Sequence, residues 1–338
     1  MEAGVPLRIA QNTNRKETNA AIIGKTVLEI VLAIIEKTDL KNTVKNILLS
    51  MRPSQWTKNA VVLAAFFFAF WDPAQSVSLK SDLPTAIIAV FLFCVISSGI
   101  YLLNDILDVK ADRAHPIKCR RPIASEQITI QTAWLMCFVL IVTGLLGAYL
   151  ASFRFAVVAL AYVAIQIIYS AFLKNIALLD IFVIAAGFVL RAIAGAVVLN
   201  VDISAWLLLC AFLLALFLAL CKRRHEKADV AGNHEQRPSL EKYDEKLLDQ
   251  LIAVVSAATV VSYSIYTLAP GTQEKFGTAG LGFTIPFVMF GIFRYLDIVY
   301  RHKRGDRPEI ILLTDIPTIV NILLYAIAVV AVFCLRSY

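Results

Sequence analysis

Nine long apolar stretches constrain the fold of this chain more than any other feature of its sequence. Most are close to the length of about 20 residues that an α-helix needs to cross the hydrocarbon core of a bilayer. The stretches are Ala60–Trp71, Pro84–Leu103, Ala133–Leu150, Phe155–Phe172, Ala177–Leu199, Ala205–Leu220, Leu251–Leu268, Gly280–Val299 and Ile316–Leu335. The first is the shortest. The pattern predicts an all-α fold, a polytopic membrane bundle of about nine transmembrane helices.

Composition and charge distribution agree with this prediction. Of the 338 residues, 59% are hydrophobic, and the mean hydropathy of +0.72 is too high for a soluble domain of this length. Of the 32 Lys and Arg residues, 26 lie in the N-terminal segment and in alternate loops. The positive-inside rule then predicts a cytoplasmic (inner or plasma) membrane protein whose N-terminus and charged loops face the cytoplasm, with the C-terminus outside. A net charge of +7 on that face suits anionic lipids or phosphorylated substrates.

The first fifty residues are interpreted as an N-terminal extension, and residues 51–338 as the transmembrane domain. The extension lacks the uninterrupted apolar core and small-residue cleavage site of a secretory signal peptide. Its residues 20–37 are apolar with interspersed Lys and Glu side chains. This pattern predicts an amphipathic helix that lies on the membrane surface or against the bundle.

An acidic cluster follows the second apolar stretch, in the segment NDILDVKAD. At helical spacing Asn104, Asp108 and Asp112 stand four residues apart on one face, with Asp105 beside them, so their oxygens can converge. Oxygen ligands suit a hard divalent cation, and protein-bound Mg²⁺ usually shares its remaining positions with substrate phosphates. The cluster therefore predicts Mg²⁺-assisted chemistry on a diphosphate at a membrane surface.

Basic residues follow these acids within a few positions, namely Arg113, Lys118, Arg120 and Arg121. A bound diphosphate needs both kinds of group, because a metal neutralises the bridging oxygens while Lys and Arg bind the outer ones. The alternative is an ordinary positive-inside loop. For the basic residues taken alone, both interpretations stay open.

Two charged residues lie within the fifth apolar stretch. Asp180 and Arg191 are eleven residues apart, so they are nearly superposed after three helical turns. An intramembrane Arg needs a partner, and Arg191 either lines a cavity and holds a phosphate or pairs with Asp180 or another acid. Lys174, just before this stretch, is explained by topology alone unless it joins Tyr169 and Asp180 in a site.

The sixth apolar stretch ends in the basic run Lys222, Arg223 and Arg224, followed by His225 and Glu226. Such a run is either a plain stop signal or a phosphate clamp. Glu226 is a candidate metal ligand that would add a carboxylate from this second segment. His225 is interpreted as a solvated or structural histidine, because no second His stands at metal-ligand spacing.

Taken together, these motifs resemble the UbiA superfamily of intramembrane prenyltransferases, helical bundles whose NDxxDxxxD motif binds Mg²⁺ and diphosphate. Within it, the chain is most similar to the decaprenyl-phosphate phosphoribosyltransferase branch. The similarity begins at Met51. The motifs that carry it are RPSQWTKN (52–59), YLLNDILDVKADRAHP (101–116), RRPIAS (120–125), YSAFLKNIALLD (169–180), GFVLRAIAGA (187–196), LALCKRRHE (218–226) and GDRPE (305–309).

The resemblance implies transfer of 5-phosphoribose from phosphoribosyl diphosphate (PRPP) to a polyprenyl phosphate in the bilayer, with release of pyrophosphate and Mg²⁺ as cofactor. Asp105, Asp108 and Asp112 would be catalytic. The implied metal ligands are Asn104, Asp105, Asp108, Asp112 and Glu226. The implied phosphate-binding residues are Lys58, Lys118, Arg121, Tyr169, Lys174, Arg191, Lys222 and Arg223. No nucleic-acid partner is expected, and a homo-oligomer is compatible with the sequence.

The chain also departs from the superfamily pattern. Cys119 and Glu126 stand where a basic residue and a glycine are expected. Ordinary members carry a second Asp-rich motif after the sixth span, where this chain has the basic KRRHE. That replacement fits a site that accommodates more phosphate groups, namely the sugar 5-phosphate and the lipid monophosphate.

Two other functions remain as alternatives. A conventional prenyltransferase would use a prenyl diphosphate as donor and alkylate an aromatic acceptor, and the same acidic motif would serve it. A lipid-phosphate transporter would also place charged residues in a bundle. The clustering of charge on one face, rather than through the bundle, weighs against transport.

Overall fold

The computed structural model describes residues 40–229, 242–301, 310–311 and 314–336. The chain divides into two compact units, Met1–Leu49 and Ser50–Tyr338. The helix α2 (Leu40–Ser50) runs across this division. The amphipathic helix predicted over residues 20–37 and the GDRPE motif lie outside the described residues.

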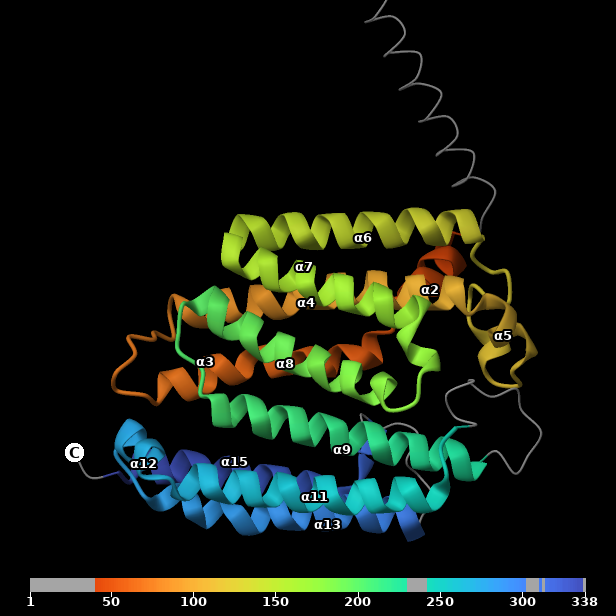
Figure 1. The fold of residues 1–338 in the computed structure, drawn as a ribbon. Coiled ribbons are helices and arrows are strands. Elements are labelled where there is room, and N and C mark those ends of the chain that lie inside the picture. The colour runs from red at the N-terminus through yellow and green to blue at the C-terminus, as the bar shows by residue number, and fades with distance from the viewer. Residues whose placement is uncertain (1–39, 230–241, 302–309, 312–313, 337–338) are drawn as a thin grey trace, which may run out of the picture. The chain divides into compact units, whose positions relative to one another are not determined.

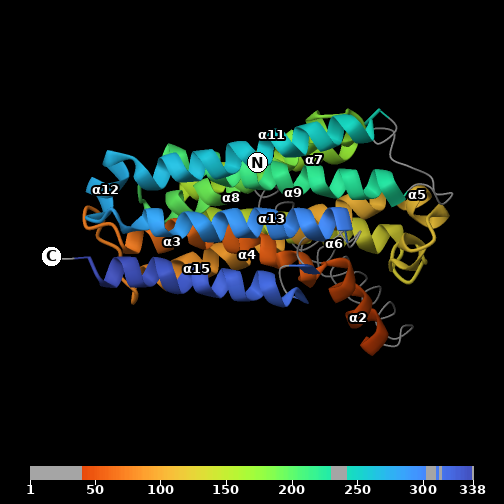
Figure 2. The same cartoon turned by 90° about the horizontal axis from the view of Figure 1, so that it is seen from below.

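The second unit is a bundle of long helices without a strand in its described part (Figures 1 and 2). Eight of the described helical segments are long and apolar enough to cross a membrane. These segments are α4 (Asp82–Leu107), α6 (Ile130–Ala151), α7 (Phe153–Ala171), α8 (Leu179–Leu199), α9 (Ala205–Asp229), α11 (Glu245–Leu268), η4 with α13 (Gly280–Arg301) and α15 (Ile316–Cys334). The predicted all-α membrane bundle is confirmed, and the protein is a multi-pass membrane protein.

The first predicted span, Ala60–Trp71, has an unexpected local structure. It is formed by the end of the 3₁₀ helix η1 (Pro53–Val62) and by the short helix α3 (Leu63–Phe70). A 3₁₀ helix rises about 2.0 Å per residue against 1.5 Å for an α-helix, so the two segments together extend over roughly 32 Å. This length is comparable to the hydrocarbon thickness of about 30 Å. As an α-helix throughout, the same two segments would extend over roughly 27 Å, so the 3₁₀ geometry lengthens them by about 5 Å.

Several apolar cores hold the described part of the bundle together, and two of them meet at α8. One joins η1, α4, α6, α7 and α8 around side chains such as Phe93 and Phe155, and the other joins α8, α9, α11 and α13 around Phe217 and Leu220. The helix α8 belongs to both cores, so it connects the two halves of the bundle. At Gly195 of α8, an added Cβ would lie 2.0 Å from the carbonyl oxygen of Val62, so this close approach to η1 requires a glycine.

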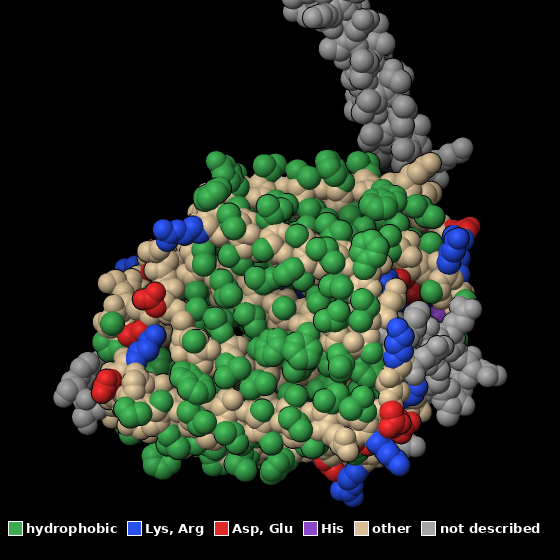
Figure 3. All heavy atoms as spheres, viewed as in Figure 1, with side chains coloured by type: hydrophobic (Ala, Val, Ile, Leu, Met, Phe, Trp, Pro, Cys, Tyr) green, Lys and Arg blue, Asp and Glu red, His purple; other side chains and the backbone are tan. Residues whose placement is uncertain are grey.

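The outer surface of the bundle is apolar along its middle and charged at its two ends. Figure 3 shows hydrophobic side chains over the central part of the visible face, with Lys, Arg, Asp and Glu at either end. Exposed large apolar residues occur on many of the described helices, including Phe91, Phe138 and Leu323. An apolar belt between two charged ends is the surface that a lipid bilayer requires.

The helices α4, α7, α9 and α13 end where α6, α8, α11 and α15 begin, at the end of the bundle that carries α5 (Val109–Ala114). We call it the α5 end. The connections there include the 3₁₀ turns η2 (Lys118–Arg120) and η3 (Leu173–Asn175). The opposite end carries the short helix α12 (Pro270–Phe276). The predicted site residues that follow the second apolar stretch, with the exception of Arg191 in the middle of α8, therefore lie at the α5 end.

Candidate active site

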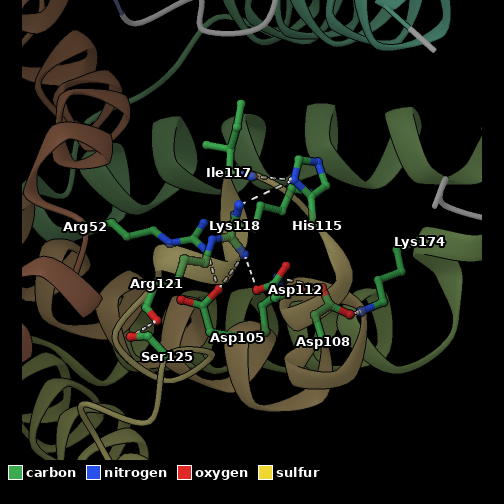
Figure 4. Close-up of polar contacts among 11 residues, drawn as sticks. Arg52, Asp105, Asp108, Asp112, His115, Ile117, Lys118, Arg121, Ser125 and Lys174 are labelled. Atoms are coloured by element: carbon green, nitrogen blue, oxygen red, sulfur yellow. Dashed lines mark hydrogen bonds and ion pairs between the residues drawn. The ribbon is translucent and has the colours of Figure 1, made fainter. Parts of the chain in front are cut away.

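The acidic motif lies at the junction of α4 and α5 (Figure 4). Asn104 and Asp105 belong to the last turn of α4, and Asp112 belongs to α5. Asp108 separates the two helices, with φ −93° and ψ 5°, outside the helical region. The helix thus changes direction within the motif, and Asp112 does not continue the face of Asn104 and Asp108 as a straight helix would require.

Asp105 and Asp112 converge on one arginine. Nη1 of Arg121 lies 3.0 Å from Oδ1 of Asp105 and 2.6 Å from Oδ2 of Asp112. Arg52 adds a second ion pair to Asp105 through Nη2. Asp105 and Asp112 are only 3% and 4% exposed, and burial of two carboxylates so close together requires this positive charge.

Asp108 forms a separate pair with Lys174. The ammonium group of Lys174 contacts Oδ1 of Asp108, and the side-chain amide of Asn104 donates to Oδ2 at 3.1 Å. Lys174 comes from η3, between α7 and α8, and is itself buried. Figure 4 shows its side chain reaching the acidic motif from the opposite side to Arg52 and Arg121. The motif therefore divides into two carboxylate–cation groups rather than converging as a set of four.

The chemistry of these groups fits a hard divalent cation. Asp105 and Asp112 already direct oxygen atoms at a single positive group, the guanidinium of Arg121. Among the described residues, no three His, Cys, Asp or Glu side chains stand close enough together to form a complete metal site. The carboxylates Asp105, Asp108 and Asp112 would supply a few oxygen ligands, and the remaining positions would be left to water or phosphate, as is usual for Mg²⁺.

The loop between α5 and α6 is held by its own contacts. Arg113 donates to the carbonyl oxygen of Ala124 at 3.2 Å and pairs with Glu126 at 2.9 Å. Nδ1 of His115 accepts from the backbone amides of Ile117 and Lys118, at 3.2 and 3.4 Å. Arg113 and His115 therefore shape the loop that carries Lys118 and Arg121.

A second polar cluster lies where α8 and α9 meet. Asp180, which is 0% exposed, accepts a 2.7 Å hydrogen bond from Nε of Arg223 and another of 2.7 Å from the hydroxyl of Tyr243. Nη1 of Arg223 also contacts Glu226. Burial, together with the hydrogen bond to Asp180, raises the pKa of Tyr243 above that of a free tyrosine, so its hydroxyl keeps its proton. Arg223 thus joins α8 to α9.

Arg191 lies within the bundle and does not pair with Asp180. Its Nε donates to Asn59 at 2.8 Å, its Nη1 to the carbonyl oxygen of Gly187 at 2.9 Å and its Nη2 to the hydroxyl of Tyr162 at 2.7 Å. The guanidinium also lies over the ring of Tyr162, 4.7 Å from its centroid. Of the two interpretations of Arg191, the pair with Asp180 is not formed among the described residues, because Asp180 binds Arg223 instead.

The remaining predicted phosphate-binding residues lie at or near the α5 end. Lys118 belongs to η2, Lys222 to the last turns of α9, and Tyr169 to the last turn of α7, all half-buried. Lys58 is half-buried on η1. Their roles in phosphate binding stay predictions.

Three residues of the polar network were absent from the predicted site. Arg52 begins η1 and pairs with Asp105, Asn59 binds Arg191, and Tyr243 binds Asp180. Arg52 and Asn59 belong to the motif RPSQWTKN, which was a signal that they matter. Nothing in the sequence around Tyr243 indicates its partner, which is 63 residues away.

Comparison with known sequences identifies relatives of this chain. The sequence profile of the UbiA prenyltransferase family matches residues 60–314. The decaprenyl-phosphate phosphoribosyltransferase of Mycolicibacterium smegmatis is 36% identical over 239 residues, which cover 68% of this chain and 72% of that protein. The enzyme of the same name from Mycobacterium tuberculosis is 34% identical over 283 residues, covering 81% of this chain and 89% of the relative.

A solved structure has the same fold. A UbiA homologue from Archaeoglobus fulgidus, bound to DMAPP and Mg²⁺, superposes with a TM-score of 0.64 and covers 86% of this chain and 99% of its own. Its sequence is 20% identical to this one, so the likeness concerns the fold alone.

Proposed function

The chain belongs to the UbiA prenyltransferase family, and we propose that within it the protein is a phosphoribosyltransferase that transfers 5-phosphoribose from PRPP to a polyprenyl phosphate. The observation that carries the proposal is the set of carboxylates at the α5 end, of which Asp105 and Asp112 are buried and Asp108 is half-buried, each of them paired with a cation. Such a set provides ligands for a metal and donors for phosphates in one place. The curated relatives named as decaprenyl-phosphate phosphoribosyltransferases support the same reaction.

In the proposed reaction, an oxygen of the lipid phosphate forms a bond to C1 of the ribose. The bond between C1 and the diphosphate oxygen breaks, and its electron pair leaves with pyrophosphate. The nucleophile is already an anion, so the reaction needs no strong general base. Nδ1 of His115, the histidine nearest the acidic motif in the sequence, accepts backbone hydrogen bonds within its own loop.

The leaving diphosphate requires charge neutralisation. Mg²⁺ held by Asp105, Asp108 and Asp112 would stabilise the negative charge that develops on the leaving group. Arg121 and Lys174 neutralise these carboxylates in the structure, and they are placed to donate to diphosphate oxygens when a donor substrate binds beside them. Binding by several fixed cations orients the sugar, and orientation can supply a large part of a rate enhancement.

The basic segment after the sixth span supports a substrate with several phosphates. At the end of α9 the chain has KRRHE in place of a second acidic motif. Arg223 and Arg224 pair with acids of the bundle, and their neighbour Lys222 is half-buried near the same end of α9. We assign Lys222, together with Lys118, to the phosphates of the sugar donor and the lipid acceptor.

The proposed orientation follows from the charge distribution. The α5 end carries most of the basic residues of the described chain, so we assign it to the cytoplasmic side of the inner or plasma membrane. PRPP is a soluble anion and would enter from that side, and the polyprenyl phosphate would present its head group from the adjacent leaflet. We assign catalysis to residues 51–338.

The deciding experiment is a transfer assay. Membranes that contain the protein are incubated with radiolabelled PRPP, Mg²⁺ and a polyprenyl phosphate, and label in the organic phase is counted. Mg²⁺-dependent, acid-labile lipid label is the expected result. No lipid label, with consumption of a prenyl diphosphate in the presence of an aromatic acceptor, would instead identify a conventional prenyltransferase. Movement of the polyprenyl phosphate from one leaflet of a vesicle membrane to the other, without cleavage of a substrate bond, would identify a transporter.

A further inference from the structure

The backbone turn between η3 and α8 is strained and carries Lys174. Leu178 has φ 70° and ψ −47°, a conformation that residues other than glycine rarely adopt. Such a conformation is energetically unfavourable and persists only where surrounding contacts impose it. Lys174 stands four residues before Leu178, and it reaches Asp108 of the acidic motif.

One side chain from a distant segment holds this turn. The hydroxyl of Tyr243 accepts the backbone N–H of Leu178 at 2.6 Å and donates to Oδ1 of Asp180 at 2.7 Å. It therefore binds the strained residue itself and the residue two positions after it. Tyr243 is 2% exposed and belongs to the core that joins α8, α9, α11 and α13, so its own position is rigid.

The turn transmits this constraint toward Lys174 through backbone hydrogen bonds. The amide of Asp180 donates to the carbonyl oxygen of Ile176 at 3.1 Å, and the amide of Ile176 donates to that of Leu173 at 3.1 Å. These two bonds connect the start of α8 to η3 without a gap. A change in the conformation of Leu178 would therefore move the residue that faces Asp108.

We infer that Tyr243 is a positioning residue: by holding the strained turn at Leu178, it places Lys174 opposite Asp108. This inference rests on the proposed function, because it assigns to Lys174 a role beside the reacting diphosphate. Tyr243 touches no reacting group and acts only through the turn.

The test compares two Tyr-to-Phe variants. Tyr243→Phe keeps the ring and removes the hydroxyl that binds Leu178. The matched control is Tyr300→Phe, because Tyr300 also donates to an aspartate, Asp249, at 2.6 Å, but it belongs to α13 and makes no contact with the turn among the described interactions. Hydrogen exchange is measured on residues 173–180, and transfer of phosphoribose is measured in parallel.

We expect Tyr243→Phe to accelerate exchange in residues 173–180 and to lower kcat about tenfold, with the KM for the lipid unchanged. In Tyr300→Phe, the exchange rate of residues 173–180 and the kcat of transfer should both stay within about twofold of the wild type. If hydrogen exchange of residues 173–180 is the same in Tyr243→Phe as in the wild type, the inference is overturned. Exchange needs no substrate, so if the wild type transfers no phosphoribose, the proposed function fails while the exchange comparison still decides whether Tyr243 holds the turn.

A glycine at the strained position separates this role from a general structural one. Glycine adopts positive φ without strain, so Leu178→Gly should form the turn without help from Tyr243. We expect Leu178→Gly to restore most of the transfer lost in Tyr243→Phe. If Tyr243→Phe alone does not fold, the double variant should fold. Failure of the glycine to restore transfer, or failure of both variants to fold, would make Tyr243 an ordinary core residue and overturn the inference.

Discussion

Asp105 and Asp112 share one nitrogen atom of Arg121, at 3.0 and 2.6 Å, although they belong to two different helices. Asp108, which separates the two helices, pairs with Lys174 instead. The acidic motif can therefore hold positive charge at two neighbouring points, as a metal-bound diphosphate with its surrounding cations requires.

Neutralising Asp108 should nearly abolish transfer. Asp108→Asn keeps the size of the side chain but removes a proposed metal ligand and the partner of Lys174. We expect phosphoribose transfer to fall by about 100-fold or more, since the loss affects charge stabilisation in the transition state. Pyrophosphate release from PRPP in the presence of Mg²⁺ is the measurement.

The matched control is Glu126→Gln, which neutralises an exposed acid of the neighbouring loop that pairs with Arg113. Its transfer rate should stay within about twofold of the wild type, because surface ion pairs contribute little. Release of pyrophosphate by Asp108→Asn at the rate of the control would contradict the metal-site assignment.

Most of the fold could be predicted from the sequence, because spans of apolar residues are a strong signal in a membrane protein. The first span is the exception. Ala60–Trp71 is short for an α-helix, and nothing in its composition indicates that the chain approaches it as the 3₁₀ helix η1. Helix type there depends on tertiary contacts, such as the approach of Gly195 to Val62.

The site could be predicted only in part. The spacing of Asp105, Asp108 and Asp112 located it, but spacing along one helix does not identify partners on other helices. Lys174 is 66 residues from Asp108, and Arg223 is 43 from Asp180. The superposition of Asp180 and Arg191 on one helix face therefore indicated a pair that the bundle does not form.

Removing one of the three hydrogen-bond partners of the intramembrane Arg191 should destabilise the protein. Asn59 is 1% exposed, and it accepts from Nε of Arg191 and donates to Ser97 at 3.1 Å. Asn59→Ala would leave a buried charged donor without a hydrogen bond, at a cost of about 3 kcal/mol. Thermal unfolding of the purified protein in detergent is the measurement.

Asn321→Ala is the control for this loss. Asn321 donates one neutral hydrogen bond, 3.0 Å long, to the carbonyl oxygen of Phe287, so its removal should cost about 1 kcal/mol. Equal melting temperatures for the Asn59→Ala and Asn321→Ala proteins would show that the charge of Arg191 is stabilised by other groups.

The contact between α8 and η1 leaves no room for a methyl group. In Gly195→Ala, the new Cβ would meet the carbonyl oxygen of Val62 at 2.0 Å, and backbone atoms cannot move aside as a flexible side chain can. We expect a loss of about 3 kcal/mol or more. In Gly271→Ala, nothing lies within 4 Å of the added atom, and the helix α12 should gain up to about 1 kcal/mol. The two melting temperatures should therefore change in opposite directions, and equal changes would contradict the close approach.

Asp315 at the start of α15 should make stability dependent on acid pH. Hydrogen bonds from Arg294, at 2.7 and 3.1 Å, hold the pKa of this carboxyl below its ordinary value, and the amide and hydroxyl of Thr318 contribute further. A carboxyl whose pKa is lower in the folded state stabilises that state above the ordinary Asp pKa of about 3.9, and the stabilisation is lost as the pH falls toward the folded pKa. Asp315→Asn should therefore lower the melting temperature at neutral pH.

The difference in melting temperature between the wild type and Asp315→Asn should narrow as the pH falls below about 4, because the unfolded wild-type chain then takes up a proton on this carboxyl while the folded chain does not. The folded carboxyl takes up its proton, and loses its charge interaction with Arg294, only at still lower pH. Asp202→Asn is the control, since Asp202 is exposed and its side chain is in none of the described ion pairs. The melting temperature of Asp202→Asn should equal that of the wild type at every pH. A constant difference for Asp315→Asn between pH 7 and the acid range would show that the cap on α15, rather than the ion pair with Arg294, carries the stabilisation.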